Sequence, residues 1–184
     1  MDSEPKEIKE KGLLVVYTGN GKGKTTAALG MAVRAAGYDW KVCIVQFIKG
    51  SWKYGELDGI IRLEPNVELN VMGQGFVGII DDDKPFEDHR AAAKTALRLA
   101  REKMLSGRYQ LIILDELNVA VSLGLVTDEE LRELVEHKPE KLHMVITGRG
   151  ATQWLIDRAD LVTEMKEIKH PFQKGILAQK GVDF

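Results

Sequence analysis

The chain has 184 residues, 29% of them charged and 44% hydrophobic, with a formal net charge of −2; this predicts one globular domain and argues against a large basic surface for nucleic acid. No apolar run approaches the roughly 20 residues of a membrane span, and the start of the chain lacks the apolar segment of a secretory signal. The single cysteine, Cys43, cannot form a disulfide within the chain, and we expect a buried thiol in a reducing compartment, the cytoplasm.

The first part of the chain is typical of a strand, a helix and a second strand. Residues 1–12 are charged, and we expect them to be loose or to become helical only when docked. An apolar run over residues 13–18 predicts a buried strand, and the alanine-rich stretch over residues 24–36 predicts a helix that packs closely on a sheet. A continuous apolar run over residues 41–47 predicts a parallel strand that is covered on both faces. This order predicts a right-handed βαβ unit.

The rest of the chain alternates further strands and helices. Alternating polarity over residues 67–71 predicts a half-exposed strand, and Asp83 is the expected N-cap of the helix that follows. The expected inward stripe of this helix consists of four apolar residues at helical spacing, Ala93, Leu97, Ala100 and Met104. Further strands are predicted at residues 111–114, 142–147 and 161–165, and further helices after a capping box at residues 127–130 and after Gly150. We therefore expect a single α/β domain over residues 13–184, with a mostly parallel sheet flanked by helices.

A glycine-rich loop connects the first predicted strand to the first predicted helix. A phosphate-binding loop needs glycines so that backbone N–H groups converge on an anion, a lysine for the terminal phosphates, and a hydroxyl for Mg²⁺. Residues 23–25, Gly-Lys-Thr, supply the end of the pattern G-x-x-x-x-G-K-[ST], whereas Thr18 stands where that pattern has its first glycine. The residues expected to bind the nucleotide are Gly19, Asn20, Gly21, Lys22, Gly23, Lys24, Thr25 and Thr26. The domain is therefore predicted to be P-loop NTPase-like, with ATP and Mg²⁺ at this loop.

Polar residues also follow three other predicted strands, at Gln46 and Lys49, at Asp115 and Glu116, and at residues 147–150. Ligands of open parallel sheets bind at such strand ends. Asp115 is the usual second acidic partner of a phosphate loop and would reach Mg²⁺ directly or through water. Three roles stay open for Glu116: a metal partner beside Thr25 and Asp115, a base for water, or a charge that favours a helix N-terminus. Arg149, between two glycines, is either a bidentate clamp on a polyphosphate or a surface charge.

The histidines do not indicate a metal site. We expect His89 and His137 to be exposed on charged helices, and His143, before a strand, to be structural. No two histidines have the spacing of zinc ligands.

Taken in order, the motifs of this chain resemble the ATP:corrinoid adenosyltransferases that act on cob(I)alamin and its cobyrinic acid precursors. The motifs that carry the resemblance lie at residues 18–28, 45–50, 114–117, 146–150, 169–175 and 178–181, and the match extends from about residue 12 to the C-terminus. The resemblance implies a homodimeric P-loop enzyme that attaches the 5′-deoxyadenosyl group of ATP to Co(I) and releases triphosphate. It also implies ATP reversed on the loop, with Lys24 and Mg²⁺ on Thr25 stabilising the leaving group, and an electron donor such as a flavoprotein.

The resemblance further implies an aromatic side chain in a mobile loop that pushes aside the lower axial ligand of cobalt. Phe76 falls where the first such aromatic residue is expected, whereas Gly78 stands where better-known members have tryptophan. Either Phe76 acts alone, or Trp52 or Phe86 enters from elsewhere.

Other functions compete with this interpretation. An NTP hydrolase or kinase would use Glu116 or Asp115 on water or on an acceptor hydroxyl and would release ADP. A nucleotide-dependent corrinoid carrier would bind both ligands without turnover. A DNA-dependent ATPase is disfavoured by the net acidity of the chain.

Overall fold

Six parallel strands form one sheet in the order β3–β2–β4–β5–β1–β6, within the residues that the structure describes. The computed structural model describes residues 11–48, 54–73 and 85–183. Its strands are β1 (Leu14–Thr18), β2 (Val42–Gln46), β3 (Val67–Val71), β4 (Leu111–Asp115), β5 (His143–Thr147) and β6 (Leu161–Glu164). Its helices are α1 (Lys24–Ala36), α2 (Gly55–Ile61), α3 (Phe86–Leu105), α4 (Leu117–Ser122), α5 (Asp128–Glu136) and α6 (Gln153–Arg158), with a 3₁₀ turn η1 (Pro171–Lys174). The predicted α/β fold class is confirmed.

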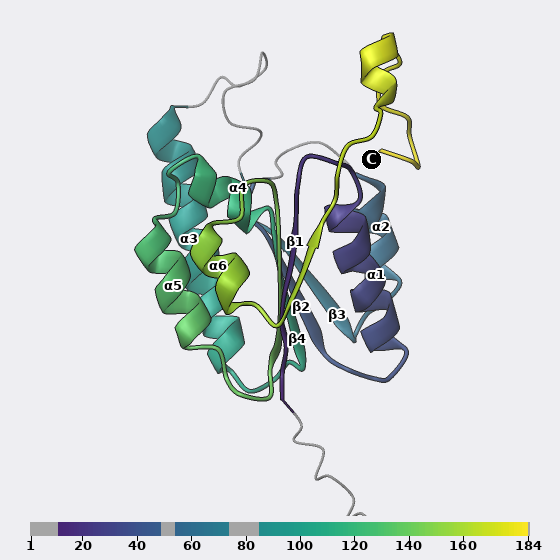
Figure 1. The fold of residues 1–184 in the computed structure, drawn as a ribbon. Coiled ribbons are helices and arrows are strands. Elements are labelled where there is room, and N and C mark those ends of the chain that lie inside the picture. The colour runs from purple at the N-terminus through teal and green to yellow at the C-terminus, as the bar shows by residue number, and fades with distance from the viewer. Residues whose placement is uncertain (1–10, 49–53, 74–84, 184) are drawn as a thin grey trace, which may run out of the picture.

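Helices cover both faces of the sheet (Figure 1). The helices α1 and α2 pack on one face, and α3, α4, α5 and α6 pack on the other. Strand side chains alternate between two apolar cores: Leu14 and Val16 belong to the core under α3, whereas Val15 belongs to the core under α1. The central strands are therefore apolar on both sides, which explains the continuous apolar runs in the sequence.

Alanines let the long helices approach the sheet closely. Ala28 of α1 and both Ala93 and Ala100 of α3 are buried. The predicted inward stripe of α3 is confirmed, since Met104 is buried as well and Leu97 packs against the same core. The helix begins at Phe86, directly after Pro85, and the predicted N-cap Asp83 lies outside the described residues.

The histidine predictions are confirmed for two residues and wrong for one. His89 is only 3% exposed, because it lies one turn before Ala93 on the inward stripe of α3. His137 is exposed, as predicted. His143 is structural, as predicted: its Nδ1 accepts the main-chain N–H of Leu13 at 3.1 Å, and its ring stacks on Trp40 with 5.2 Å between centroids.

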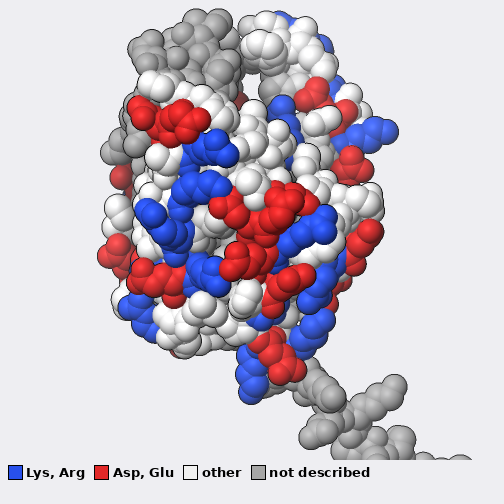
Figure 2. Space-filling model, turned by 90° about the vertical axis from the view of Figure 1, so that its left-hand side faces the viewer, with Lys and Arg blue, Asp and Glu red and all other residues white. Residues whose placement is uncertain are grey.

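Side chains of both charge signs are interspersed on the face that α3 and α5 form (Figure 2). Lys94 of α3 pairs with Glu130 of α5, and Arg101 pairs with Glu133 at 2.6 Å. The Arg101–Glu133 pair is exposed and the Lys94–Glu130 pair is half-buried, and surface pairs of this kind each contribute only about 0–1 kcal/mol to stability.

After β6 the chain crosses the loop between β1 and α1. The edge strand β6 is exposed along its length, and residues 165–183 continue beyond the carboxyl edge of the sheet (Figure 1). The main-chain N–H of Gly21 donates to the carbonyl oxygen of Met165 at 2.6 Å. This crossing brings the C-terminal segment next to the predicted phosphate site.

Candidate active site

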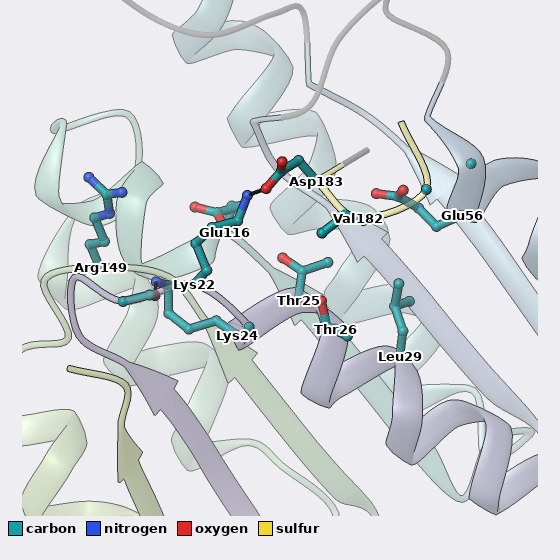
Figure 3. A pocket seen from close by; sticks show the side chains of 14 residues that line it. Lys22, Lys24, Thr25, Thr26, Leu29, Glu56, Glu116, Arg149, Val182 and Asp183 are labelled. Carbon is teal, nitrogen blue, oxygen red and sulfur yellow. Dashed lines mark hydrogen bonds and ion pairs between the residues drawn. The ribbon is translucent and has the colours of Figure 1, made fainter. Parts of the chain in front are cut away.

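One pocket of about 560 Å³ opens at the carboxyl edge of the sheet, beside the loop between β1 and α1 (Figure 3). This volume lies in the range of small-molecule sites. The pocket is lined by residues of five separate segments: Gly21, Lys22, Gly23, Lys24, Thr25, Thr26, Leu29, Gly55, Glu56, Glu116, Arg149, Gly181, Val182 and Asp183. Gly19 and Asn20, which the sequence also assigns to the phosphate site, do not line it; Asn20 lines a second depression, to which Arg149 also contributes.

Two of the loop glycines are required by the chain that crosses them. Gly19 has a φ of 93°, and a Cβ at this position would lie 2.5 Å from the carbonyl oxygen of Met165. A Cβ on Gly21 would lie 2.7 Å from the same oxygen. Glycine is therefore required at these two positions by the close contact with the crossing chain, in addition to any role in phosphate binding. Thr18, at the altered first position, accepts the main-chain N–H of Ala151 at 3.3 Å and joins β1 to the turn after β5.

Lys24 lies inside the loop and is only 6% exposed. Its Nζ donates to the carbonyl oxygens of Gly19 and Gly21 at 2.8 and 2.7 Å. Burial lowers the pKa of this ammonium group, and the nearby Glu116 carboxylate opposes the shift. A phosphate that entered the loop would compete with the two carbonyls for a cation that is already poorly hydrated, which strengthens its attraction for an anion.

Asp115 is held by side chains from three elements. Its Oδ1 accepts hydrogen bonds from the hydroxyls of Thr25 at 2.9 Å and Thr147 at 2.7 Å, and its Oδ2 accepts one from Nε2 of Gln46 at 3.0 Å. The carboxylate is 1% exposed. The predicted pair of Thr25 and Asp115 thus lies in direct contact at the start of α1.

Glu116 follows Asp115 in a left-handed backbone conformation, with φ 63° and ψ 18°. This conformation is uncommon for a residue with a side chain. It begins α4 and places Glu116 on the wall of the pocket, where Figure 3 shows it with the loop lysines. Of the roles left open by the sequence, the position on the wall suits either a metal partner or a base for water.

Two further cations lie at the mouth of the pocket. The exposed Nζ of Lys22 forms an ion pair with Asp183, drawn as a dashed line in Figure 3. Arg149 is exposed on the rim, after β5. Asp183 and Glu56 were missed by the sequence reasoning: Asp183 lies just beyond the motif at residues 178–181, whereas Glu56 carries no local signal.

The oxygen donors suit a Mg²⁺ ion that is shared with a polyphosphate. Thr25, Asp115 and Glu116 offer a hydroxyl and two carboxylates next to one pocket. In the described part of the chain, no cluster of three or more His, Cys, Asp or Glu side chains could hold a metal alone. Mg²⁺ usually takes one or two carboxylates together with substrate phosphates and water, so this donor set fits Mg²⁺ bound with a nucleotide.

The aromatic residues predicted for the corrinoid lie mostly outside the described residues. This holds for Phe76 and Trp52, and also for Gly78, whereas Phe86 is the first residue of α3 and is 46% exposed.

None of the described helices is long and apolar enough to cross a membrane.

Known proteins resemble this chain along nearly its whole length. A family model described as ATP:corrinoid adenosyltransferase BtuR/CobO/CobP matches residues 10–184. The corrinoid adenosyltransferase of Pseudomonas aeruginosa is 41% identical over 175 residues, which cover 95% of this chain and 85% of that protein. That of Escherichia coli K12 is 39% identical over 176 residues, which cover 95% of this chain and 87% of that protein.

Among solved structures, domain III of the Thermotoga maritima replication initiation protein DnaA is similar over 92% of this chain and 61% of that chain, at 16% identity. Its TM-score of 0.41 is too low to support an argument. The family model and the two relatives, in contrast, agree over at least 95% of the chain, and they show that the chain belongs to the ATP:corrinoid adenosyltransferase family BtuR/CobO/CobP.

Proposed function

We propose that this chain transfers the 5′-deoxyadenosyl group of ATP to the Co(I) centre of a corrinoid and releases triphosphate, in the synthesis or salvage of adenosylcobalamin. Membership of the family supports this activity. The structural observation that carries it is the convergence of three cationic side chains, Lys22, Lys24 and Arg149, on one pocket at the N-terminus of α1. Cations and a helix N-terminus together suit a polyanion.

The proposed reaction requires groups that bind and stabilise the leaving triphosphate. The electron pair of Co(I) forms a bond to C5′ of the ribose, the C5′–O bond breaks, and its electron pair leaves with the triphosphate. No proton has to move in this step, so a general base is not required. Preorganised donors aimed at the developing charge are worth about 3 kcal/mol each in such reactions.

We assign the binding of the triphosphate to the loop between β1 and α1 and to the two acidic residues Asp115 and Glu116. The backbone N–H groups of residues 19–25 and the ammonium group of Lys24 would bind the triphosphate, and the buried position of Lys24 supports its role. Thr25, Asp115 and Glu116 would hold Mg²⁺, and Arg149 would contact the polyphosphate from the rim. When bound, Mg²⁺ neutralises part of the charge on the triphosphate.

Other parts of the proposal rest on the resemblance to the family. Phe76 would displace the lower axial ligand of cobalt, and an electron donor such as a flavoprotein would supply the reduced metal. The enzyme would act as a homodimer in the cytoplasm, where the lone thiol of Cys43 would stay reduced.

An anaerobic assay tests the proposal. The protein is mixed with ATP, Mg²⁺ and chemically reduced cob(I)alamin, the Co–C bond is followed by absorbance, and the phosphate products are separated by chromatography. We expect one triphosphate for each Co–C bond. ADP without a Co–C bond would indicate a hydrolase or kinase, and binding of both ligands without turnover would indicate a carrier.

A further inference from the structure

A single buried hydroxyl connects the two acidic residues of the site. The Thr147 hydroxyl donates to Oδ1 of Asp115 at 2.7 Å and accepts the main-chain N–H of Glu116 at 2.9 Å. Thr147 is 0% exposed, so water cannot replace either bond without a change in the fold. Because a hydroxyl has one hydrogen to donate, these two bonds fix its orientation.

The Asp115 carboxylate accepts hydrogen bonds from side chains of both neighbouring strands. The strands β2 and β5 flank β4 in the sheet, and Gln46 at the end of β2 is the register partner of Asp115. Gln46 holds Oδ2 at 3.0 Å, whereas Thr147 at the end of β5 holds Oδ1. With both oxygens bonded, the carboxylate cannot turn freely, and its Oδ1 stays 2.9 Å from the Thr25 hydroxyl.

The same hydroxyl holds the backbone of Glu116. Within the described residues, Glu116 is one of two non-glycine residues with positive φ, the other being Asp39. Strained conformations of this kind persist only where their surroundings hold them. The bond from Glu116 N–H to Thr147 is one such constraint, and it acts at the turn that sets where the Glu116 side chain meets the pocket.

We propose that Thr147 is a positioning residue for Mg²⁺: its hydroxyl fixes Asp115 through the side chain and Glu116 through the main chain, so that both carboxylates meet the metal–triphosphate complex together. This inference rests on the proposed function. Groups that orient metal ligands in this way change metal affinity or activity by about 10- to 100-fold when removed. If Thr147 were only structural, its replacement would lower the stability of the fold and leave the Mg²⁺ dependence of ATP binding unchanged.

Thr147→Val tests the inference, since valine keeps the shape of threonine and removes the hydroxyl. Calorimetry would measure the affinity for ATP in Mg²⁺ and in EDTA, and the ratio of the two affinities isolates the contribution of the metal. We expect this ratio to fall by about tenfold or more in Thr147→Val. Thr147→Ser, which keeps a hydroxyl, should restore most of it. The Mg²⁺ concentration for half-maximal transfer should rise in parallel.

Ile146→Val is the matched control, because it also perturbs the buried end of β5 but removes no polar group. Its ratio should equal that of the wild type. If Thr147→Val does not fold by circular dichroism, Thr147→Ala carries the same test. Two results would overturn the inference. One is a ratio of ATP affinities in the variant without the hydroxyl that equals the ratio in Ile146→Val. The other is a Thr147→Ser variant that is as impaired as Thr147→Val. Absence of a Co–C bond with the wild type would remove only the proposed function, since the ATP titrations do not involve cobalt.

Discussion

Replacing Lys24 with methionine removes the ammonium group from the loop while keeping an unbranched side chain of similar length. The lysine is 6% exposed, and its Nζ donates to the carbonyl oxygens of Gly19 and Gly21 at 2.8 and 2.7 Å. Hydrogen bonds from a charged donor contribute about 1.5–3 kcal/mol each to stability. The lowered pKa of Lys24 shows that burial works against the charge, and this desolvation offsets much of that contribution.

We therefore expect Lys24→Met to change the free energy of unfolding by no more than about 2 kcal/mol, because the lost bonds and the relieved desolvation oppose each other. No such compensation is expected for the activation free energy of the transfer. The charge on the departing triphosphate grows in the transition state, and loss of one aimed donor costs about 3 kcal/mol, or at least about a hundredfold in kcat.

Two measurements check this prediction. Urea titration gives the free energy of unfolding, and the anaerobic Co–C assay at saturating ATP gives kcat. Lys22→Met serves as the comparison: it removes an exposed cation of the same loop and should cost much less in kcat. A Lys24→Met enzyme with kcat within a few-fold of the wild type would refute the assigned role, and so would an unfolded Lys24→Met protein.

Three further changes test other contacts. Gly21→Ala places a Cβ 2.7 Å from the carbonyl oxygen of Met165, so we expect a lower melting temperature together with at least about a tenfold loss of ATP affinity, whereas wild-type values of both would contradict the steric argument. Asp183→Asn removes the carboxylate that competes with phosphate for Lys22, and calorimetry should show ATP affinity up to about fivefold higher; an unchanged or weaker affinity would count against the competition. For Glu68, burial raises the pKa but hydrogen bonds from a lysine, a tyrosine and an asparagine outweigh it and lower the pKa to about 2, from 4.5. Its contribution to stability is therefore present above pH 4.5 and is lost as the pH falls toward 2, so urea titrations of Glu68→Gln should show a flatter acid dependence than the wild type, and equal slopes would refute this.

Elements whose signals are local could be predicted from the sequence. Residues 24–36 are helical with the predicted bounds, because a run of small apolar residues after a glycine-rich loop specifies both the start and the packing of the helix. The buried strands were also predictable, since parallel strands covered on both faces appear as continuous apolar runs. The contact of Thr25 with Asp115 follows from the same logic, because parallel strands end at one edge of the sheet.

Features that depend on contacts between distant segments could not be predicted. The sequence gives no local reason for the return of Asp183 to Lys22, because that contact depends on the path of the chain after β6. His89 was misjudged because the charged residues around it on α3 concealed an inward stripe that starts one turn earlier. Thr147 was predicted only as part of a polar strand end; its contacts with Asp115 and Glu116 depend on the register of β4 and β5.

The measurement that tests the central claim most directly follows the oxygen between C5′ and the α-phosphorus of ATP. ATP labelled with ¹⁸O at this position is incubated anaerobically with the protein, Mg²⁺ and cob(I)alamin, and mass spectrometry locates the label in the products. If the loop around Lys24 grips a leaving group, the C5′–O bond breaks and every labelled oxygen is found in the triphosphate. Label retained in ADP, AMP or adenosine, with unlabelled phosphate or polyphosphate as the other product, would show cleavage at phosphorus and would contradict the account.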